Sequence, residues 1–114
     1  MKERYIANDT VREIIEKINL FYRDSDFSVA RLSEIMHINK CYMCEVFRKN
    51  TGITILKYIN NKKIVEAKAM LLSGEAIVSC ADKLGFGSYN DFIRVFGKIT
   101  GDSPKKYLSK SVNL

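Results

Sequence analysis

The sequence predicts an all-α fold of seven helices, in which two helix-turn-helix units are joined by one long linker helix. Apolar residues recur at spacings of three and four along the 114 residues, and no strand-like alternation interrupts them. Capping residues and glycines stand where these periodic stretches begin and end. An internal repeat relates the two halves of the chain. These three observations together favour two similar helical units.

Composition and charge restrict the class of protein. A chain of 114 residues forms one domain or two very small ones, and 46% hydrophobic with 28% charged residues is typical of a globular protein. The net charge of +6 indicates a polyanionic partner, with nucleic acid first and an anionic membrane surface second. No apolar run of about 18 residues exists, so no membrane span is expected. Three cysteines at no secretory spacing favour a reducing cytoplasm.

The first two helices are expected in the first third of the chain. Asp9 or Thr10 can cap the first helix. Its apolar residues form a one-sided stripe at helical spacing, made of Val11, Ile14, Ile15, Ile18, Phe21 and Tyr22. Ser28 can cap the second helix, which buries Val29, Leu32, Ile35 and Met36. A turn at His37 and Ile38 follows, and histidine tolerates the left-handed conformation that such a turn requires.

The third helix and the linker helix occupy the middle of the chain. Asn39 can cap the third helix, and Gly52 ends it. Its inward-facing residues are Met43, Val46 and Phe47. From Thr54 to Ser73 no helix-breaking residue occurs, and Gly74 follows as a stop signal. The apolar residues of this stretch spread around it, which predicts neighbours on more than one side: Leu56, Ile59, Ile64, Val65, Ala67, Met70, Leu71 and Leu72.

The last three helices form the second unit. A helix over residues 77–84 is followed by Gly85, which can take the positive φ of a tight turn. Ser88 can cap the sixth helix, and Gly101 ends it. Ser103-Pro104 then opens the seventh helix, with serine as the N-cap and proline at the first helical position. The aromatic side chains of the two units are expected in the cores: Phe47, Tyr58, Phe86, Phe92, Phe96 and Tyr107.

The internal repeat defines the organisation. Before the turn, five positions of the two units match at an offset of 48 residues. They pair, in order, Val29, Leu32, Ser33, Met36 and Ile38 with Ile77, Cys80, Ala81, Leu84 and Phe86. After the turn the offset becomes 49, and it pairs Asn39, Met43, Phe47, Lys49, Thr51, Gly52, Thr54 and Tyr58 with Ser88, Phe92, Phe96, Lys98, Thr100, Gly101, Ser103 and Tyr107. We therefore expect a first unit over residues 9–53, a linker helix over 54–74 and a second unit over 75–109.

The linker predicts how two such units would use DNA. Successive major-groove faces of a duplex lie about 34 Å apart. A helix of about twenty residues spans roughly 30 Å, so it can hold two recognition helices near that spacing. One monomer would then do what simpler helix-turn-helix proteins achieve by dimerising. The expected target is an asymmetric site rather than a palindrome.

Many residues of the second unit stand at characteristic positions: Ala81, Gly85, Phe86, Ser88, Asn90, Phe92, Arg94, Phe96, Gly101, Ser103, Pro104 and Tyr107. This set closely resembles the signature of the AraC/XylS family of bacterial transcription regulators. The first unit and the linker also resemble that family, at Met43, Phe47, Gly52, Ile64, Ala67, Lys68, Leu71 and Leu72. The resemblance runs from about Asp9 to Tyr107. It departs at Gly97 and Leu108, where lysine and arginine are usual, and Asp91 adds a negative charge.

The resemblance implies what the protein does and with whom. It implies homeodomain-like units that bind double-stranded promoter DNA and regulate transcription, mostly by activation, through contact with RNA polymerase. Many members carry an N-terminal effector or dimerisation domain, so such a domain is a further expected partner. The expected location is the bacterial cytoplasm, at the nucleoid. No cofactor or metal is expected, and the absence of a nucleophile constellation or a glycine-rich phosphate loop argues against an enzyme.

Two groups of residues are candidates for DNA contact. In the first unit the outward-facing set is Asn39, Lys40, Cys41, Tyr42, Cys44, Glu45, Arg48 and Lys49. By analogy with the family, Cys41, Cys44 and Glu45 hold base-reading positions. Phosphate contacts suit Asn39, Tyr42, Arg48 and Lys49. In the second unit the set is Ser88, Tyr89, Asn90, Ile93, Arg94, Lys98, Lys105 and Lys106. There Asn90 suits adenine and Arg94 suits guanine or a phosphate, while the lysines suit the backbone.

Two other functions remain open at this point. Cys41 and Cys44 form a C-x-x-C, and with His37 or Cys80 they suggest a zinc site or a redox pair. There is no second C-x-x-C, which favours the DNA-facing interpretation. The other alternative is a protein-interaction adaptor that kept the fold with weak DNA affinity. This alternative is supported by the acidic Glu45 and Asp91 and by Gly97.

Overall fold

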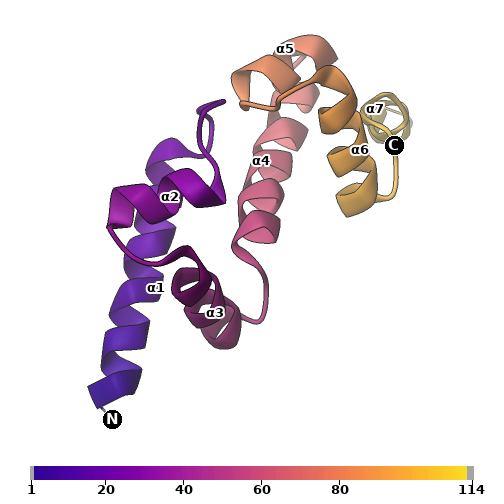
Figure 1. The fold of residues 1–114 in the computed structure, drawn as a ribbon. Coiled ribbons are helices and arrows are strands. Elements are labelled where there is room, and N and C mark those ends of the chain that lie inside the picture. Colours follow the sequence, from indigo (N-terminus) through magenta and orange to yellow (C-terminus); the bar gives the residue numbers. More distant parts are fainter. Residues whose placement is uncertain (1, 113–114) are drawn as a thin grey trace. The chain divides into compact units, whose positions relative to one another are not determined.

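A computed structural model describes residues 2–112, and this part of the chain contains seven helices and no strands (Figure 1). The helices are α1 (Lys2–Phe21), α2 (Val29–Met36), α3 (Lys40–Thr51), α4 (Ile55–Leu72), α5 (Ile77–Lys83), α6 (Tyr89–Thr100) and α7 (Pro104–Val112). The predicted all-α fold with two helix-turn-helix units is confirmed. No described helix combines the length and the apolar character needed to cross a membrane.

The chain forms two compact units, and the division falls inside α4. The first unit holds α1, α2, α3 and the beginning of α4 up to Ile59. The second holds α4 from Asn60 onward with α5, α6 and α7, and residues Arg23–Ser25 group with it. The boundaries predicted for the two units and the linker stay a prediction.

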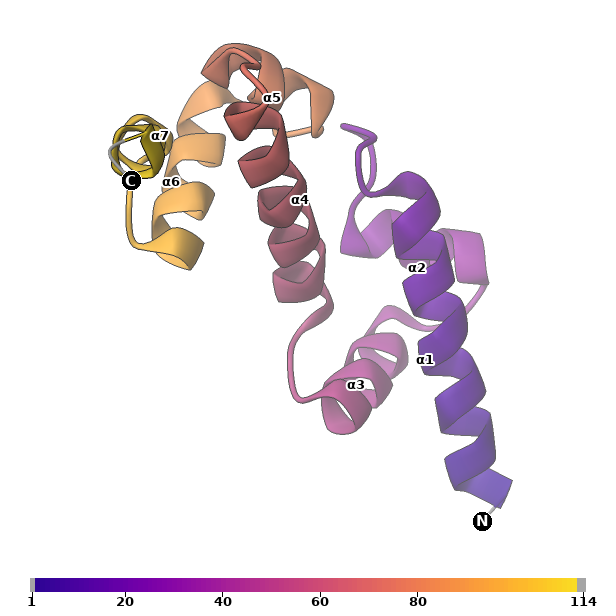
Figure 2. The same ribbon diagram turned by 180° about the vertical axis from the view of Figure 1, so that it is seen from behind.

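A small apolar core holds the first unit together. α1 and α3 contact each other, and both contact α2, as the two opposite views of the fold also show (Figures 1 and 2). The buried residues of this core are Ile14, Ile18, Leu32, Met43, Phe47, Ile55 and Ile59. They come from all three helices and from the first two turns of α4. Helical spacing therefore identified these buried positions, but on α2 only Leu32 is buried, and Val29, Ile35 and Met36 are half-buried.

The start of α1 differs from the expectation. The helix begins at Lys2, so the predicted cap at Asp9 or Thr10 is wrong. Asp9 lies inside the helix and forms an ion pair with Arg12, at 2.5 Å. Nothing in the preceding residues breaks a helix, and a capping residue is a preference for a helix start, not a barrier to a helix that continues through it.

The other helix ends follow the predicted signals. Ser28, Asn39 and Ser88 accept hydrogen bonds from backbone N–H groups three residues on, at 3.0, 3.0 and 3.1 Å. Pro104 occupies the first position of α7, as predicted. The turn after α2 has His37 at φ 56°, and the repeat pairs this residue with Gly85 at φ 74°. Histidine and glycine thus fill the same left-handed position in the two units.

The repeat is also visible in the side-chain geometry. Phe47 and Tyr58 meet edge-on with ring centroids 5.6 Å apart, and Phe96 and Tyr107 do so at the same distance. The hydroxyl of Thr51 donates to the carbonyl of Phe47 at 2.7 Å. At the equivalent position Thr100 donates to Phe96 at 2.8 Å. Equivalent aromatic and threonine contacts therefore stabilise the C-terminal ends of the recognition helices in the two units.

The linker helix contributes buried residues to both units and leaves other apolar residues exposed. Ile55 and Ile59 belong to the first core, while Ile64, Ala67 and Leu71 are buried. Leu56, Val65 and Leu72 are exposed, at 58, 68 and 57%. Burial on one side of α4 is therefore less complete than its sequence indicated.

Candidate nucleic-acid interface

The candidate residues of the first unit lie along the outer side of α3. Met43, Val46 and Phe47 turn inward and are buried, which leaves the other positions of the helix facing outward. Of the candidates, Cys44 is half-buried and the rest are exposed: Asn39, Lys40, Cys41, Tyr42, Glu45, Arg48 and Lys49. Three of these are cationic and one is anionic. The structure thus brings the predicted set together on one helix face.

The second unit repeats this arrangement on α6. Phe92, Val95 and Phe96 are buried, so the opposite side of the helix faces outward. Ile93 is half-buried, like Cys44 at the equivalent position, and the other candidates are exposed: Ser88, Tyr89, Asn90, Arg94, Lys98, Lys105 and Lys106. Lys105 and Lys106 come from the first turn of α7 rather than from α6. The second set therefore combines one helix face with the start of the next helix.

Ion pairs engage two of the candidate base-reading residues. Glu45 pairs with Lys49 at 2.9 Å, one turn along α3. Arg94 lies 3.6 Å from Asp91, which precedes it on α6. All four side chains are more than half exposed, and such surface pairs contribute at most about 1 kcal/mol. The side chains can therefore exchange these partners for DNA groups at little cost.

An open groove borders the first set of candidates. It has a volume of about 640 Å³ and is lined by Val29, Cys44, Glu45, Arg48, Lys49, Thr54, Ile55 and Leu56. Four of these are candidates for DNA contact. The groove lies between the outer side of α3 and the beginning of α4, within the first unit. The C-terminal half of α3 therefore forms one side of this groove.

A buried lysine lies behind the second recognition helix. Lys63 on α4 is only 7% exposed, and burial lowers the pKa of its ammonium group. Its Nζ donates to the carbonyl of Gly85 at 3.4 Å and lies 4.8 Å from the centroid of the Phe86 ring. Phe86 in turn packs against Phe92 of α6, with centroids 5.1 Å apart. Lys63 therefore connects the linker helix to the turn that positions α6.

Sequence reasoning did not single out Lys63, although a signal was present. It stands four residues after Ile59 and four before Ala67, so it falls on the buried side of an otherwise apolar stripe. A lysine at such a position needs a partner for its ammonium group. The Gly85 carbonyl is that partner. The face of the aromatic ring provides a second favourable contact.

The cysteines and His37 do not form one group. Cys41 is exposed, Cys44 is half-buried and Cys80 is buried within α5. Burial raises the pKa of the Cys80 thiol, and the Glu75 carboxylate adds to this shift. Within the described residues, no three histidine, cysteine or acidic side chains are close enough to hold a metal ion. His37 serves the turn after α2, at its left-handed C-cap.

Comparison with known proteins identifies the family. A family described as "Helix-turn-helix domain" matches residues 32–110. The C-terminal domain of the two-component response regulator yesN from Fusobacterium nucleatum is 33% identical, with a TM-score of 0.81 over 85% of this chain and 95% of that one. The arabinose operon regulatory protein of Escherichia coli is 29% identical over 88% of this chain. The chain belongs to the AraC/XylS family of transcription regulators.

A further relative and a further solved structure are similar to this chain. An uncharacterized helix-turn-helix regulator of Bacillus subtilis, YobQ, is 35% identical over 70% of this chain. The DNA-binding domain of AdpA, solved in complex with a target DNA, has the same fold at 21% identity, with a TM-score of 0.79 over 88% of this chain and 90% of that one. The chain spans about a third of the length of the curated relatives, 34% of YobQ and 35% of the arabinose regulator. It is a DNA-binding domain of the AraC type.

Proposed function

We propose that this AraC-type domain places α3 and α6 in successive major grooves of an asymmetric promoter site and thereby regulates transcription, mostly by activation. The observation that carries the proposal is that the two units have matching recognition helices with different outward residues. The equivalent positions hold Cys41 and Asn90, Cys44 and Ile93, and Glu45 and Arg94. Because the side chains differ at each reading position, the two half-sites should differ too.

The chemistry of each reading residue suggests a preferred base. Glu45 can accept from the amino group of cytosine, and the thiols of Cys41 and Cys44 can pack against thymine methyl groups. In the second unit Asn90 suits the paired donor and acceptor of adenine, Ile93 suits a thymine methyl, and Arg94 suits guanine or a phosphate. These assignments extend the predictions made from the sequence.

The remaining candidates suit the sugar–phosphate backbone. The side chains of Asn39 and Ser88 already accept from the backbone as helix caps, and each retains a donor for a phosphate oxygen. Tyr42 and Tyr89 are exposed beside these caps, at 47 and 45%, so their hydroxyl groups are accessible. The cationic side chains supply charge neutralisation: Lys40, Arg48, Lys49, Lys98, Lys105 and Lys106.

Selection of bound sequences from random duplex DNA tests the proposal. We expect one asymmetric consensus with two informative segments about one helical turn apart. Scrambling either segment should weaken binding, and affinity should fall steeply as salt rises. A palindromic consensus, or one segment only, would contradict the use of both units by one chain. A chain with no salt-dependent affinity for duplex DNA would instead favour the protein-adaptor function.

We propose two partners beyond DNA, as the resemblance to the family suggests. Contact with RNA polymerase would explain activation, and an effector or dimerisation domain would make binding conditional. Transcription from the selected site, measured with purified polymerase with and without the chain, tests the first. An increase in transcript supports activation, and a decrease supports repression.

A further inference from the structure

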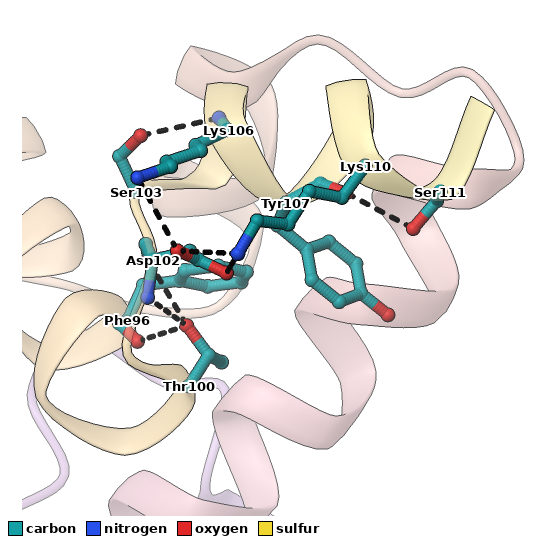
Figure 3. A network of polar contacts seen from close by, with 8 residues as sticks. All are labelled: Phe96, Thr100, Asp102, Ser103, Lys106, Tyr107, Lys110 and Ser111. Atoms are coloured by element: carbon teal, nitrogen blue, oxygen red, sulfur yellow. Dashed lines mark hydrogen bonds and ion pairs between the residues drawn. The ribbon is translucent and has the colours of Figure 1, made fainter. Parts of the chain in front are cut away.

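A largely shielded carboxylate, that of Asp102, lies between the second recognition helix and the helix after it. The Asp102 carboxylate accepts from Lys110 Nζ at 3.0 and 3.3 Å, and it lies 4.0 Å from Lys106 Nζ (Figure 3). Both lysines project from α7, and Asp102 is in the short connection that follows α6. One anion therefore partners two cations on the α7 side of the second unit.

The backbone around Asp102 is held more tightly than the lysines are. Its N–H donates to Thr100 Oγ1 at 3.2 Å, and the threonine hydroxyl approaches the carbonyls of Phe96 and Asp102 at 2.8 and 2.9 Å (Figure 3). The Asp102 side chain is 19% exposed, compared with 66% for Lys106 and 62% for Lys110. The backbone that carries the carboxylate is therefore held in place and the carboxylate is largely shielded, while the two lysine side chains are exposed and accessible to another anion.

The first unit lacks this carboxylate although it shares the surrounding contacts. The position equivalent to Asp102 is Ile53, whose N–H donates to Thr51 Oγ1 at 3.3 Å in the same way. The backbone arrangement thus forms without any acid at this position. The carboxylate is an addition of the second unit, and the turn itself does not require it.

We propose that Asp102 is a specificity-determining residue that competes with DNA phosphates for Lys106 and Lys110. This rests on the proposed function, in which Lys105 and Lys106 contact the DNA backbone, and it adds Lys110, which lies one turn beyond Lys106 on α7. Phosphate contacts add affinity without sequence information. A carboxylate that holds two of the available cations reduces this sequence-independent affinity, so binding by the second unit depends more on the base-reading residues of α6.

The substitution Asp102→Asn tests this, with Asp82→Asn as the matched control. Asp82 is an exposed residue of α5, and its substitution changes the net charge by the same amount. Affinity for the selected site and for a random duplex is measured over a salt series. Asp102→Asn should bind both duplexes about two- to fivefold more tightly at low salt, with the larger gain on the random duplex. Its salt slope should steepen by about one to two.

Further variants separate this role from a structural one. Adding Lys106→Gln and Lys110→Gln to Asp102→Asn should remove the gain, because no freed cation remains. With Asp102 intact, the same two lysine substitutions should reduce the salt slope by less than they do in the Asp102→Asn background, since the carboxylate already competes with the phosphates for both cations. The salt slope of the lysine variants with Asp102 intact, compared with that in the Asp102→Asn background, tests the competition for these cations even if Asp102→Asn lowers the melting temperature.

The possible outcomes are distinct. If wild-type chain binds DNA with the expected salt dependence but Asp102→Asn behaves like Asp82→Asn, the role of Asp102 is contradicted and the proposed function stands. An equal loss of salt slope on substitution of the two lysines with Asp102 present and with Asp102→Asn would also overturn it. If wild-type chain shows no salt-dependent binding, the proposed function itself fails.

Discussion

The ring of Phe96 meets the ring of Tyr107 nearly edge-on, with centroids 5.6 Å apart and planes at 74°. Phe47 and Tyr58 repeat the contact at 5.6 Å and 77°. Each pair ties a recognition helix to the helix that follows it, α6 to α7 and α3 to α4. In the second unit Lys68 adds a cation 5.9 Å from the centroid of the Tyr107 ring. Aromatic packing therefore fixes how each recognition helix is presented.

The substitution Tyr107→Ala should lower the free energy of unfolding by about 2–3 kcal/mol, because it removes a half-buried ring that packs on Phe96. Thermal or urea unfolding measures the loss. Tyr107→Phe is the control, since it keeps the ring and removes only the hydroxyl, and it should remain close to wild type. An unchanged melting temperature for Tyr107→Ala would contradict the role of this pair.

The substitution Gly97→Ala should raise the stability of the second unit by about 0.5–1 kcal/mol, because glycine inside a helix costs backbone entropy. A Cβ at Gly97 would find its nearest neighbour, the Asp102 carbonyl oxygen, at an ordinary contact distance of 3.9 Å. Gly101→Ala provides the contrast, because that residue has φ 86° and a side chain there is strained. Equal shifts in melting temperature for the two variants would refute the argument.

The substitution Arg94→Ala should weaken binding to the selected site by about 1–3 kcal/mol and relax the preference at one base position, if the guanidinium reads a base. Lys98→Ala serves as the comparison on the same helix. It should weaken binding to all sequences alike and reduce the salt slope by about one. Gel-shift titrations with the selected site and single-base variants distinguish the two patterns. Wild-type affinity for Arg94→Ala would exclude it from the interface.

Acid should destabilise the start of α5 through Glu75. Its carboxylate accepts from Ser79 Oγ at 2.5 Å and from Lys83 Nζ at 3.0 Å, and these hydrogen bonds lower the pKa of the carboxyl below its ordinary 4.5. The folded pKa is the lower one, so this stabilisation is complete above pH 4.5 and is lost as the pH falls through the folded pKa.

The control for this prediction is Glu75→Gln, which keeps the shape of the side chain and removes its titration. The difference in unfolding free energy between wild type and the variant should shrink as the pH is lowered below about 4.5. Chemical denaturation at a series of pH values gives this difference directly. A constant difference down to pH 3 would show that the Glu75 hydrogen bonds contribute nothing to the pH dependence.

Most of the candidate interface could be predicted because its signals are local. Asn39 and Ser88 begin recognition helices that Gly52 and Gly101 end, since a cap and a left-handed glycine act within one turn of the chain. Helical spacing then separated the inward side of each helix from the outward side. The same reasoning failed at Asp9, where a residue suited to capping lies within a continuous helix.

By itself, the sequence determined the seven helices, their repeat and the faces that turn inward, because periodicity, capping and backbone φ preferences are properties of neighbouring residues. Only the tertiary structure decided which apolar residues of α4 stay exposed, that Lys63 is buried against the Gly85 carbonyl, and that Asp102 partners Lys106 and Lys110. These facts depend on which groups other helices and turns bring near a side chain. Burial and charge pairing of this kind are set by contacts in space, which helical periodicity does not specify.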